Sequence, residues 1–111
     1  MITVVEMSEF TRLSNKLLTA DEKRELIELL ARDPMSGEVI SKTGGVRKLR
    51  FARSGQGKSG SYRVIYYYYN QLNPVFLFSI YGKNQKGNIS DAEKNNFFKA
   101  IQILKKGLKN G

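Results

Sequence analysis

The chain of 111 residues contains no cysteine and no histidine. Without cysteine there is no disulfide framework and no thiolate nucleophile, and the redox compartment stays open. Without histidine the chain lacks the commonest metal ligand and the usual acid–base catalyst at neutral pH. We therefore expect no metal site and no cofactor, and any catalysis must use other side chains.

Long apolar runs are also missing. No stretch approaches the ~20 apolar residues that cross a bilayer, and the N-terminal MITVVEMSEF lacks the basic region and long apolar stretch of a secretory signal. We expect a cytoplasmic protein that does not enter a membrane. With 41% hydrophobic residues the chain has room for a single domain over residues 1–111, and such a domain buries roughly two-thirds of its unfolded surface.

The third absence is local, since no acidic residue lies between Glu38 and Asp91. Outside that interval ten cations balance ten acids, so the interval carries the whole net charge of +9. A face that is merely solvated normally mixes both signs. A surplus confined to one segment therefore predicts a positive patch that binds polyanions. Its nine cations are Lys42, Arg47, Lys48, Arg50, Arg53, Lys58, Arg63, Lys83 and Lys86.

Three segments have helical patterns. The first repeats apolar residues at i, i+3 and i+7 after a serine that we expect to cap it. The second and third each begin with a capping box, in which a serine or threonine is followed three residues later by glutamate. Proline ends the second helix, because it disfavours an α conformation in the residue before it. The first two helices should pack antiparallel. The expected caps are Ser8, Thr19 with Glu22, and Ser90 with Glu93.

The middle of the chain has the pattern of strands. Residues 46–52 alternate, so that Lys48 and Arg50 lie on one face while Arg47, Leu49 and Phe51 lie on the other. We expect further strands over residues 2–6, 61–70 and 75–82, with a glycine-rich loop at 55–60 and a turn at 70–74. The later strands are apolar at nearly every position, which predicts a sheet covered on both faces. The order β-α-α-β-β-β-α indicates an α+β fold.

Basic residues interleaved with aromatic ones suit single-stranded RNA, because cations hold phosphates and rings stack on bases. The rings belong to Tyr62, Tyr66, Tyr67, Tyr68, Tyr69 and Tyr81. Tyrosine is also a favoured strand residue, and we expect most of these rings to pack within the sheet. The loop GQGKSG is not a phosphate loop, since its spacing is wrong and strands flank it on both sides.

Two stretches carry a family resemblance. TGGVRKLRFARSGQGKSGSYRVIYYYY at 43–69 and LFSIYGKNQKGNIS at 77–90 resemble the RelE/HigB toxin superfamily, and more closely its HigB-type branch. The resemblance implies a RelE-like microbial RNase fold, with a small, mainly antiparallel sheet packed by helices. It implies the toxin of a type II toxin–antitoxin pair, which cleaves translated messenger RNA on the ribosome without a metal. The implied partners are the ribosome, its messenger RNA and a cognate antitoxin, expected to be a HigA-like helix-turn-helix protein.

The chemistry of the basic segment fits such an enzyme. RNA supplies its own 2′-OH nucleophile, so the protein has to position it, move protons and stabilise the pentavalent phosphate. We expect Arg50 and Arg63 to clamp the phosphate, because arginine is the better bidentate phosphate ligand. Lys48 and Lys83 are the candidates for proton transfer. We expect all four to converge, with Arg63 opposite Lys48 and Arg50.

Four further residues are candidate RNA contacts: Arg53, Lys58, Tyr81 and Asn84. Lys58 lies in the glycine-rich loop, and Tyr81 could stack on a base or orient the substrate. The basic positions that RelE-type enzymes use are matched by Lys48, Arg50 and Arg63. Where those enzymes have a further arginine after the last strand, this chain has Asn84, and it lacks their downstream tyrosine.

Two other functions stay open. A non-catalytic RNA- or ribosome-binding module would bind with marked salt dependence and cut nothing. A ParE-like gyrase inhibitor would share the fold. A surface that only docks on protein has less need of converging phosphate ligands, which favours the nuclease.

Overall fold

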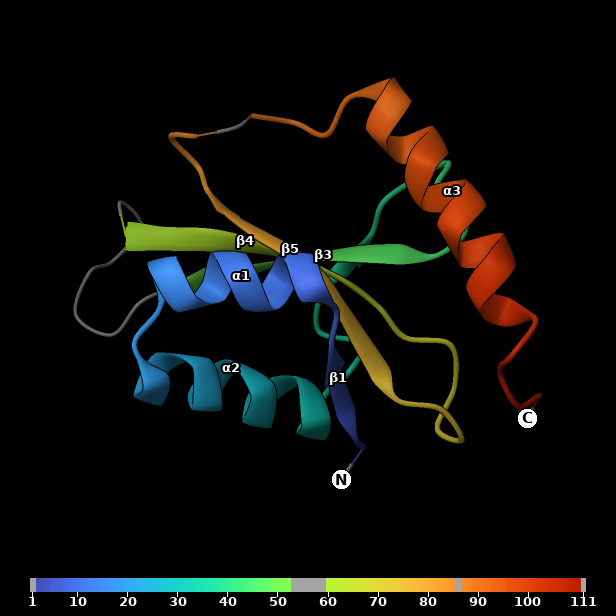
Figure 1. The fold of residues 1–111 in the computed structure, drawn as a ribbon, viewed down its shortest axis with the longest axis horizontal. Helices are drawn as coiled ribbons and strands as arrows, with labels where there is room; N and C mark the ends of the chain where they lie inside the picture. Colours follow the sequence, from blue (N-terminus) through green and yellow to red (C-terminus); the bar gives the residue numbers. More distant parts are fainter. Residues whose placement is uncertain (1, 53–59, 86, 111) are drawn as a thin grey trace.

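The strands form one five-stranded sheet in the order β1-β5-β4-β3-β2 (Figure 1). The computed structural model describes residues 2–52, 60–85 and 87–110. Only the β1–β5 pair is parallel, and the other neighbours are antiparallel. The elements in chain order are β1 (Val4–Glu6), α1 (Ser8–Leu17), α2 (Ala20–Arg32), β2 (Glu38–Val39), β3 (Val46–Ala52), β4 (Ser61–Tyr67), β5 (Val75–Gly82) and α3 (Asp91–Lys105).

Helices cover both faces of the sheet. On one face α1 and α2 run antiparallel (Figure 1), and Phe10 and Leu26 from them pack on Leu49, Val64 and other strand residues. On the other face Ile101 of α3 packs on Val46 and Ile65. This confirms the two-sided burial that the apolar strands predict. Within the described part of the chain, no helix is long and apolar enough to span a membrane.

Most of the expected elements are confirmed. β3 and β5 have the predicted bounds, and β3, β4 and β5 form the predicted antiparallel meander. Both capping boxes are present: Thr19 Oγ1 accepts from Glu22 N at 3.1 Å, and Ser90 Oγ accepts from Glu93 N at 3.2 Å. The second helix ends at Arg32, just before Asp33 and Pro34, as predicted.

Three expectations were wrong. Ser8 does not cap α1: Met7 is the cap residue, and it makes no side-chain cap hydrogen bond. The strands expected at 2–6 and 61–70 are shorter, ending as Val4–Glu6 and Ser61–Tyr67. The sequence pattern also missed β2, because two exposed residues have no alternation to detect. The order is therefore β-α-α-β-β-β-β-α.

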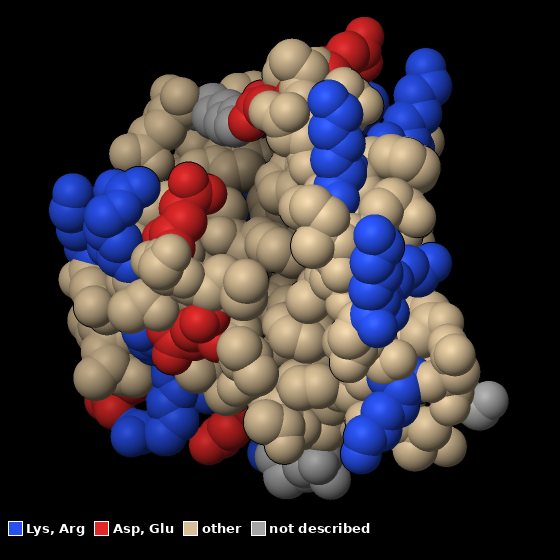
Figure 2. Space-filling model, turned by 45° about the vertical axis from the view of Figure 1, so that its right-hand side comes forward, with Lys and Arg blue, Asp and Glu red and all other residues tan. Residues whose placement is uncertain are grey.

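Charge is distributed unevenly between the two faces. Residues 1–38, which hold α1 and α2, carry eight acids and five cations, whereas residues 91–111, which hold α3, carry two acids and five cations. Figure 2 brings the α3 side forward and shows Lys and Arg side chains following one another down the right of the surface, with acids mixed among cations on the left. The face of the sheet on which α3 packs is thus the more basic one.

Candidate functional site

Three neighbouring strands place a row of polar side chains across the α3 face of the sheet. Arg50 of β3 is the register partner of Arg63 on β4, and Arg63 is in turn the partner of Tyr81 on β5. Directly opposed residues have Cβ atoms about 5 Å apart. Arg63 therefore lies opposite Arg50, as the strand alternation predicts.

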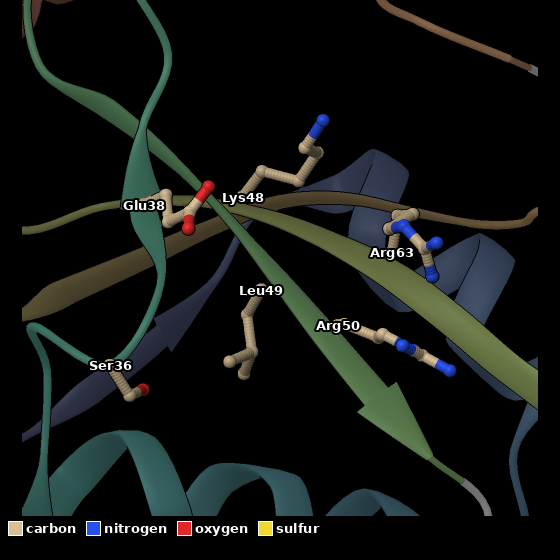
Figure 3. Close-up of a pocket in the computed structure, with 6 residues that line it drawn as sticks. All are labelled: Ser36, Glu38, Lys48, Leu49, Arg50 and Arg63. Atoms are coloured by element: carbon tan, nitrogen blue, oxygen red, sulfur yellow. The ribbon is translucent and has the colours of Figure 1, made fainter. Parts of the chain in front are cut away.

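Two hollows adjoin this row and bring the lysines to it. The larger, of about 410 Å³, is lined by Ser36, Glu38, Lys48, Leu49, Arg50 and Arg63 (Figure 3). The smaller, of about 160 Å³, is lined by Lys48, Arg63, Tyr81, Lys83, Gly87 and Asn88. Lys48 and Arg63 line both. The structure thus brings together Lys48, Arg50, Arg63, Tyr81 and Lys83, which we call the basic site.

Among the described residues, no ion pair neutralises the cations of the basic site. Like charges placed directly opposite one another destabilise a sheet, and Arg50 and Arg63 are such a pair. In the described part of the chain, the ion pairs join Glu6 to Lys23, Asp21 to Arg24 and Glu28 to Arg32, and none involves the basic site. The row suits a bound anion such as a phosphate, which would relieve the repulsion.

Tyr81 contributes a neutral hydroxyl to these cationic surroundings. The residue is 9% exposed and packs within the α3-side core. Burial raises the pKa of its phenol, and the nearby Arg63 opposes that rise in part. The phenol therefore stays protonated at neutral pH and can donate a hydrogen bond to a substrate oxygen.

The remaining predicted contacts are not placed in the basic site. Arg53 and Lys58 lie outside the described residues. Asn84 is exposed in the turn after β5 and is not among the described residues that line the two hollows. Tyr66 and Tyr67 are 0% and 2% exposed and belong to the core, as the packing interpretation predicts.

One charged lining residue of these hollows was not predicted from the sequence. Glu38 of β2 is the register partner of Lys48, on the same face of the sheet, and it lines the larger hollow. In the sequence, Glu38 is notable only as the last acidic residue before the interval that has none. Nothing local indicated its position, because the strand that carries it has two residues.

The backbone before Glu38 is held by side chains from the neighbouring strands. The hydroxyl of Tyr66 accepts from Gly37 N at 2.7 Å and donates to Pro34 O at 2.8 Å. Arg47 donates from Nη1 to Gly37 O at 2.7 Å. Arg47 thus lies on the opposite face from the basic site and fastens β2, in agreement with its expected place beside Leu49 and Phe51.

Among the described residues, no three of the Asp and Glu side chains gather in a group that could hold a metal ion. The polar groups of the basic site are ammonium, guanidinium and phenol groups, which do not bind cations as they stand.

A row of cationic side chains across one face of an open sheet is suited to binding an anion. A family model described as the RelE toxin of the RelE / RelB toxin–antitoxin system matches residues 2–110. The chain belongs to the RelE toxin family.

Proposed function

We propose that this protein is a ribosome-dependent endoribonuclease that cleaves messenger RNA during translation and thereby stops it. Such cleavage is the general activity of the RelE toxin family, to which the chain belongs. The observation that carries the proposal is the row of Arg50, Arg63 and Tyr81 across three strands, with Lys48 and Lys83 lining the adjoining hollows.

The reaction needs only groups that this row can supply. The 2′-oxygen of the RNA attacks the adjacent phosphorus, the bond from phosphorus to the 5′-oxygen breaks, and the products are a 2′,3′-cyclic phosphate and a 5′-hydroxyl. Negative charge builds up on the phosphoryl oxygens in the transition state. Two guanidinium groups on adjacent strands, held in place by the sheet, stabilise that charge without reorganising. Arg50 and Arg63 take this role.

The other members of the site handle protons and orientation. Lys48 and Lys83 move protons to or from the 2′- and 5′-oxygens. The protonated hydroxyl of Tyr81 donates a hydrogen bond to the phosphate or the ribose, because burial keeps its pKa above the ordinary value. Arg53, Lys58 and Asn84 contact RNA farther from the scissile bond.

The finer assignment follows the sequence motifs. We place the chain in the HigB-type branch, with a HigA-like helix-turn-helix antitoxin encoded beside it. An antitoxin can silence the site by presenting carboxylates to the basic row or by preventing entry into the ribosomal A site.

Cleavage on translating ribosomes tests the proposal. The purified protein is added to a reconstituted translation reaction, and new 5′ ends in the message are mapped by primer extension. We expect cuts with the wild-type protein and none with the triple variant Lys48→Ala, Arg63→Ala and Lys83→Ala. The control triple variant, Arg12→Ala, Lys16→Ala and Arg32→Ala, removes the same charge from exposed positions on α1 and α2 and should cut normally.

Two results count against the proposal. If the basic-site triple variant cuts as fast as the wild type, the site is wrong. If the wild type binds ribosomes but cuts nothing, the protein is a binding module rather than a nuclease.

A further inference from the structure

One carboxylate lines a hollow beside the basic site. Glu38 is the only acid among the described residues that line the two hollows of the basic site. It is paired with Lys48 across the β2–β3 ladder. Figure 3 shows its carboxylate turned toward β3. An acid beside a phosphate site weakens phosphate binding, so its presence there needs an explanation.

The need for a proton acceptor supplies an explanation for this carboxylate. Attack by the 2′-oxygen requires a group that removes the 2′-OH proton. Charged lysine and arginine side chains only donate protons, and a protonated tyrosine hydroxyl already carries its own. An ionised carboxylate only accepts. Among the described residues that line the two hollows, Glu38 thus carries the one carboxylate, the group suited to accept that proton.

The Glu38 carboxylate is not engaged elsewhere in the described structure. The ordinary alternative is a cross-strand ion pair with Lys48 that fastens β2 to β3. However, within the described part of the chain no ion pair or hydrogen bond of the Glu38 side chain is formed. β2 is fastened instead through Gly37, whose N–H and carbonyl are bound by Tyr66 and Arg47 at 2.7 Å each. Glu38 therefore projects from a fixed backbone with its oxygens open to a substrate.

We infer that Glu38 is the general base of the cleavage reaction, an inference that depends on the proposed nuclease function. The Glu38 carboxylate takes the 2′-OH proton as the bond from the 2′-oxygen to phosphorus forms. As the bond from phosphorus to the 5′-oxygen breaks, that oxygen takes a proton from Lys48 or Lys83. Arg50 and Arg63 hold the phosphoryl oxygens throughout. Solvent then removes the proton from Glu38 and restores the lysine.

The test separates catalysis from binding with the variant Glu38→Gln. This variant keeps the shape of the side chain and removes the carboxylate that would accept the 2′-OH proton. Single-turnover cleavage of a ribosome-bound message is measured between about pH 4 and pH 8, so that the range reaches the pH at which carboxylates take up a proton. Binding is measured with a message that carries a 2′-deoxyribose at the cut position. Glu25→Gln is the matched control, since Glu25 is an exposed acid on α2.

We expect Glu38→Gln to slow cleavage by about 10²- to 10⁴-fold, the usual contribution of a general base. The wild-type rate should fall toward low pH, and that fall should be missing from the residual rate of the variant. The charged groups that line the same hollow as Glu38 are Lys48 and Arg50 from β3 and Arg63 from β4. Because a negative charge has been removed from among them, the variant should bind the deoxy message as tightly as the wild type or more tightly.

Other outcomes overturn the inference. A Glu38→Gln variant that cleaves at the wild-type rate excludes Glu38 as the base and leaves the nuclease function standing. A slow variant that keeps the low-pH fall, or that loses binding of the deoxy message, shows a structural role instead. A wild-type protein that fails to cut refutes the proposed nuclease function itself. The control variant Glu25→Gln would then fail to cut as well.

Discussion

Arg63 occupies the middle of the basic row, with Arg50 on one side and Tyr81 on the other. Two cations directly opposite each other lower the stability of a sheet. The fold tolerates this repulsion where a ligand phosphate would relieve it. Stability and activity should therefore respond in opposite directions when the central charge is removed.

We expect Arg63→Ala to lower the single-turnover cleavage rate by about 10²- to 10³-fold, the usual loss when one transition-state donor is removed. Its free energy of unfolding should stay the same or rise by about 0.2–1 kcal/mol, because the repulsion with Arg50 is gone. Urea unfolding followed by circular dichroism measures the second quantity.

Arg47→Ala, on the neighbouring strand β3, is the matched control for Arg63→Ala. Arg47 donates hydrogen bonds to Gly37 O at 2.7 Å and to Met35 O at 3.3 Å. Removing the Arg47 side chain should lower the free energy of unfolding by about 1–3 kcal/mol, as for other hydrogen bonds to charged groups. An Arg63→Ala variant as unstable as Arg47→Ala would show that Arg63 has a structural role rather than a catalytic one.

Residues on the long strands can be assigned to a face from sequence because the strand period is local. Alternation over residues 46–52 is enough to separate Lys48 and Arg50 from Arg47. The same reasoning could not find Glu38, because its place opposite Lys48 depends on pairing between segments and not on a local pattern.

At the level of elements, β2 is the part of the site that sequence could not predict. The long strands and both capping boxes follow from local pattern and local hydrogen bonds. β2 depends on tertiary contacts: its preceding residue, Gly37, lies against the buried ring of Tyr66. Ser8 does not cap α1, because β1 leads directly into the helix with Met7 between them as the cap residue.

Gly37 gives a direct test of how β2 is held. A Cβ at this position would lie 2.8 Å from Tyr66 Cε1 and 2.9 Å from the backbone oxygen of Lys48. Neither neighbour can move easily, since one is a buried ring and the other is backbone. We expect Gly37→Ala to lower the free energy of unfolding by about 1–3 kcal/mol, the usual cost of overpacking.

The control is Gly107→Ala, where the nearest atom to the new Cβ is the Leu104 oxygen at 3.8 Å, an ordinary contact. It should leave the stability close to that of the wild type. Equal stability of the Gly37→Ala and wild-type proteins in urea would mean that the β2 segment can shift away from Tyr66.

At the scale of the whole molecule, three buried tyrosines make the stability of the fold depend on pH in the alkaline range. Burial raises the pKa of Tyr66, Tyr67 and Tyr81 above the ordinary value of about 10. A raised pKa in the folded state means that their contribution to stability is complete below pH 10 and is lost as pH rises through the folded values. We expect the free energy of unfolding to decline above about pH 10.

Tyr67→Phe provides the variant for this test, because in the described part of the chain the Tyr67 hydroxyl makes no hydrogen bond that would be lost. Its free energy of unfolding should decline less steeply above pH 10 than that of the wild type, while tyrosinate absorbance shows one late-ionising group fewer. Identical declines for the two proteins would show that Tyr67 ionises in the folded state as readily as in the unfolded chain.

The last whole-molecule feature is the polarity of charge across the sheet. The α3 face carries the basic site and the five cations of residues 91–111, whereas residues 1–38 behind the other face have more acids than cations. A molecule with this polarity approaches a polyanion with its α3 face first. The electrostatic part of RNA binding should therefore come from this face.

Salt dependence measures that contribution. For single-stranded RNA the logarithm of the binding constant falls with the logarithm of salt concentration by about 0.7 for each phosphate contacted. Because Arg50 and Arg63 clamp one phosphate, the double variant Arg50→Ala and Arg63→Ala should reduce the slope by about 0.7. The double variant Arg12→Ala and Arg32→Ala, on α1 and α2, removes the same charge from the opposite face and should leave the slope unchanged. Fluorescence anisotropy of a labelled oligonucleotide that carries 2′-deoxyribose, and so cannot be cut, gives the slopes. If both double variants lose slope equally, binding follows net charge alone, and the row across β3 and β4 is not where the phosphates lie.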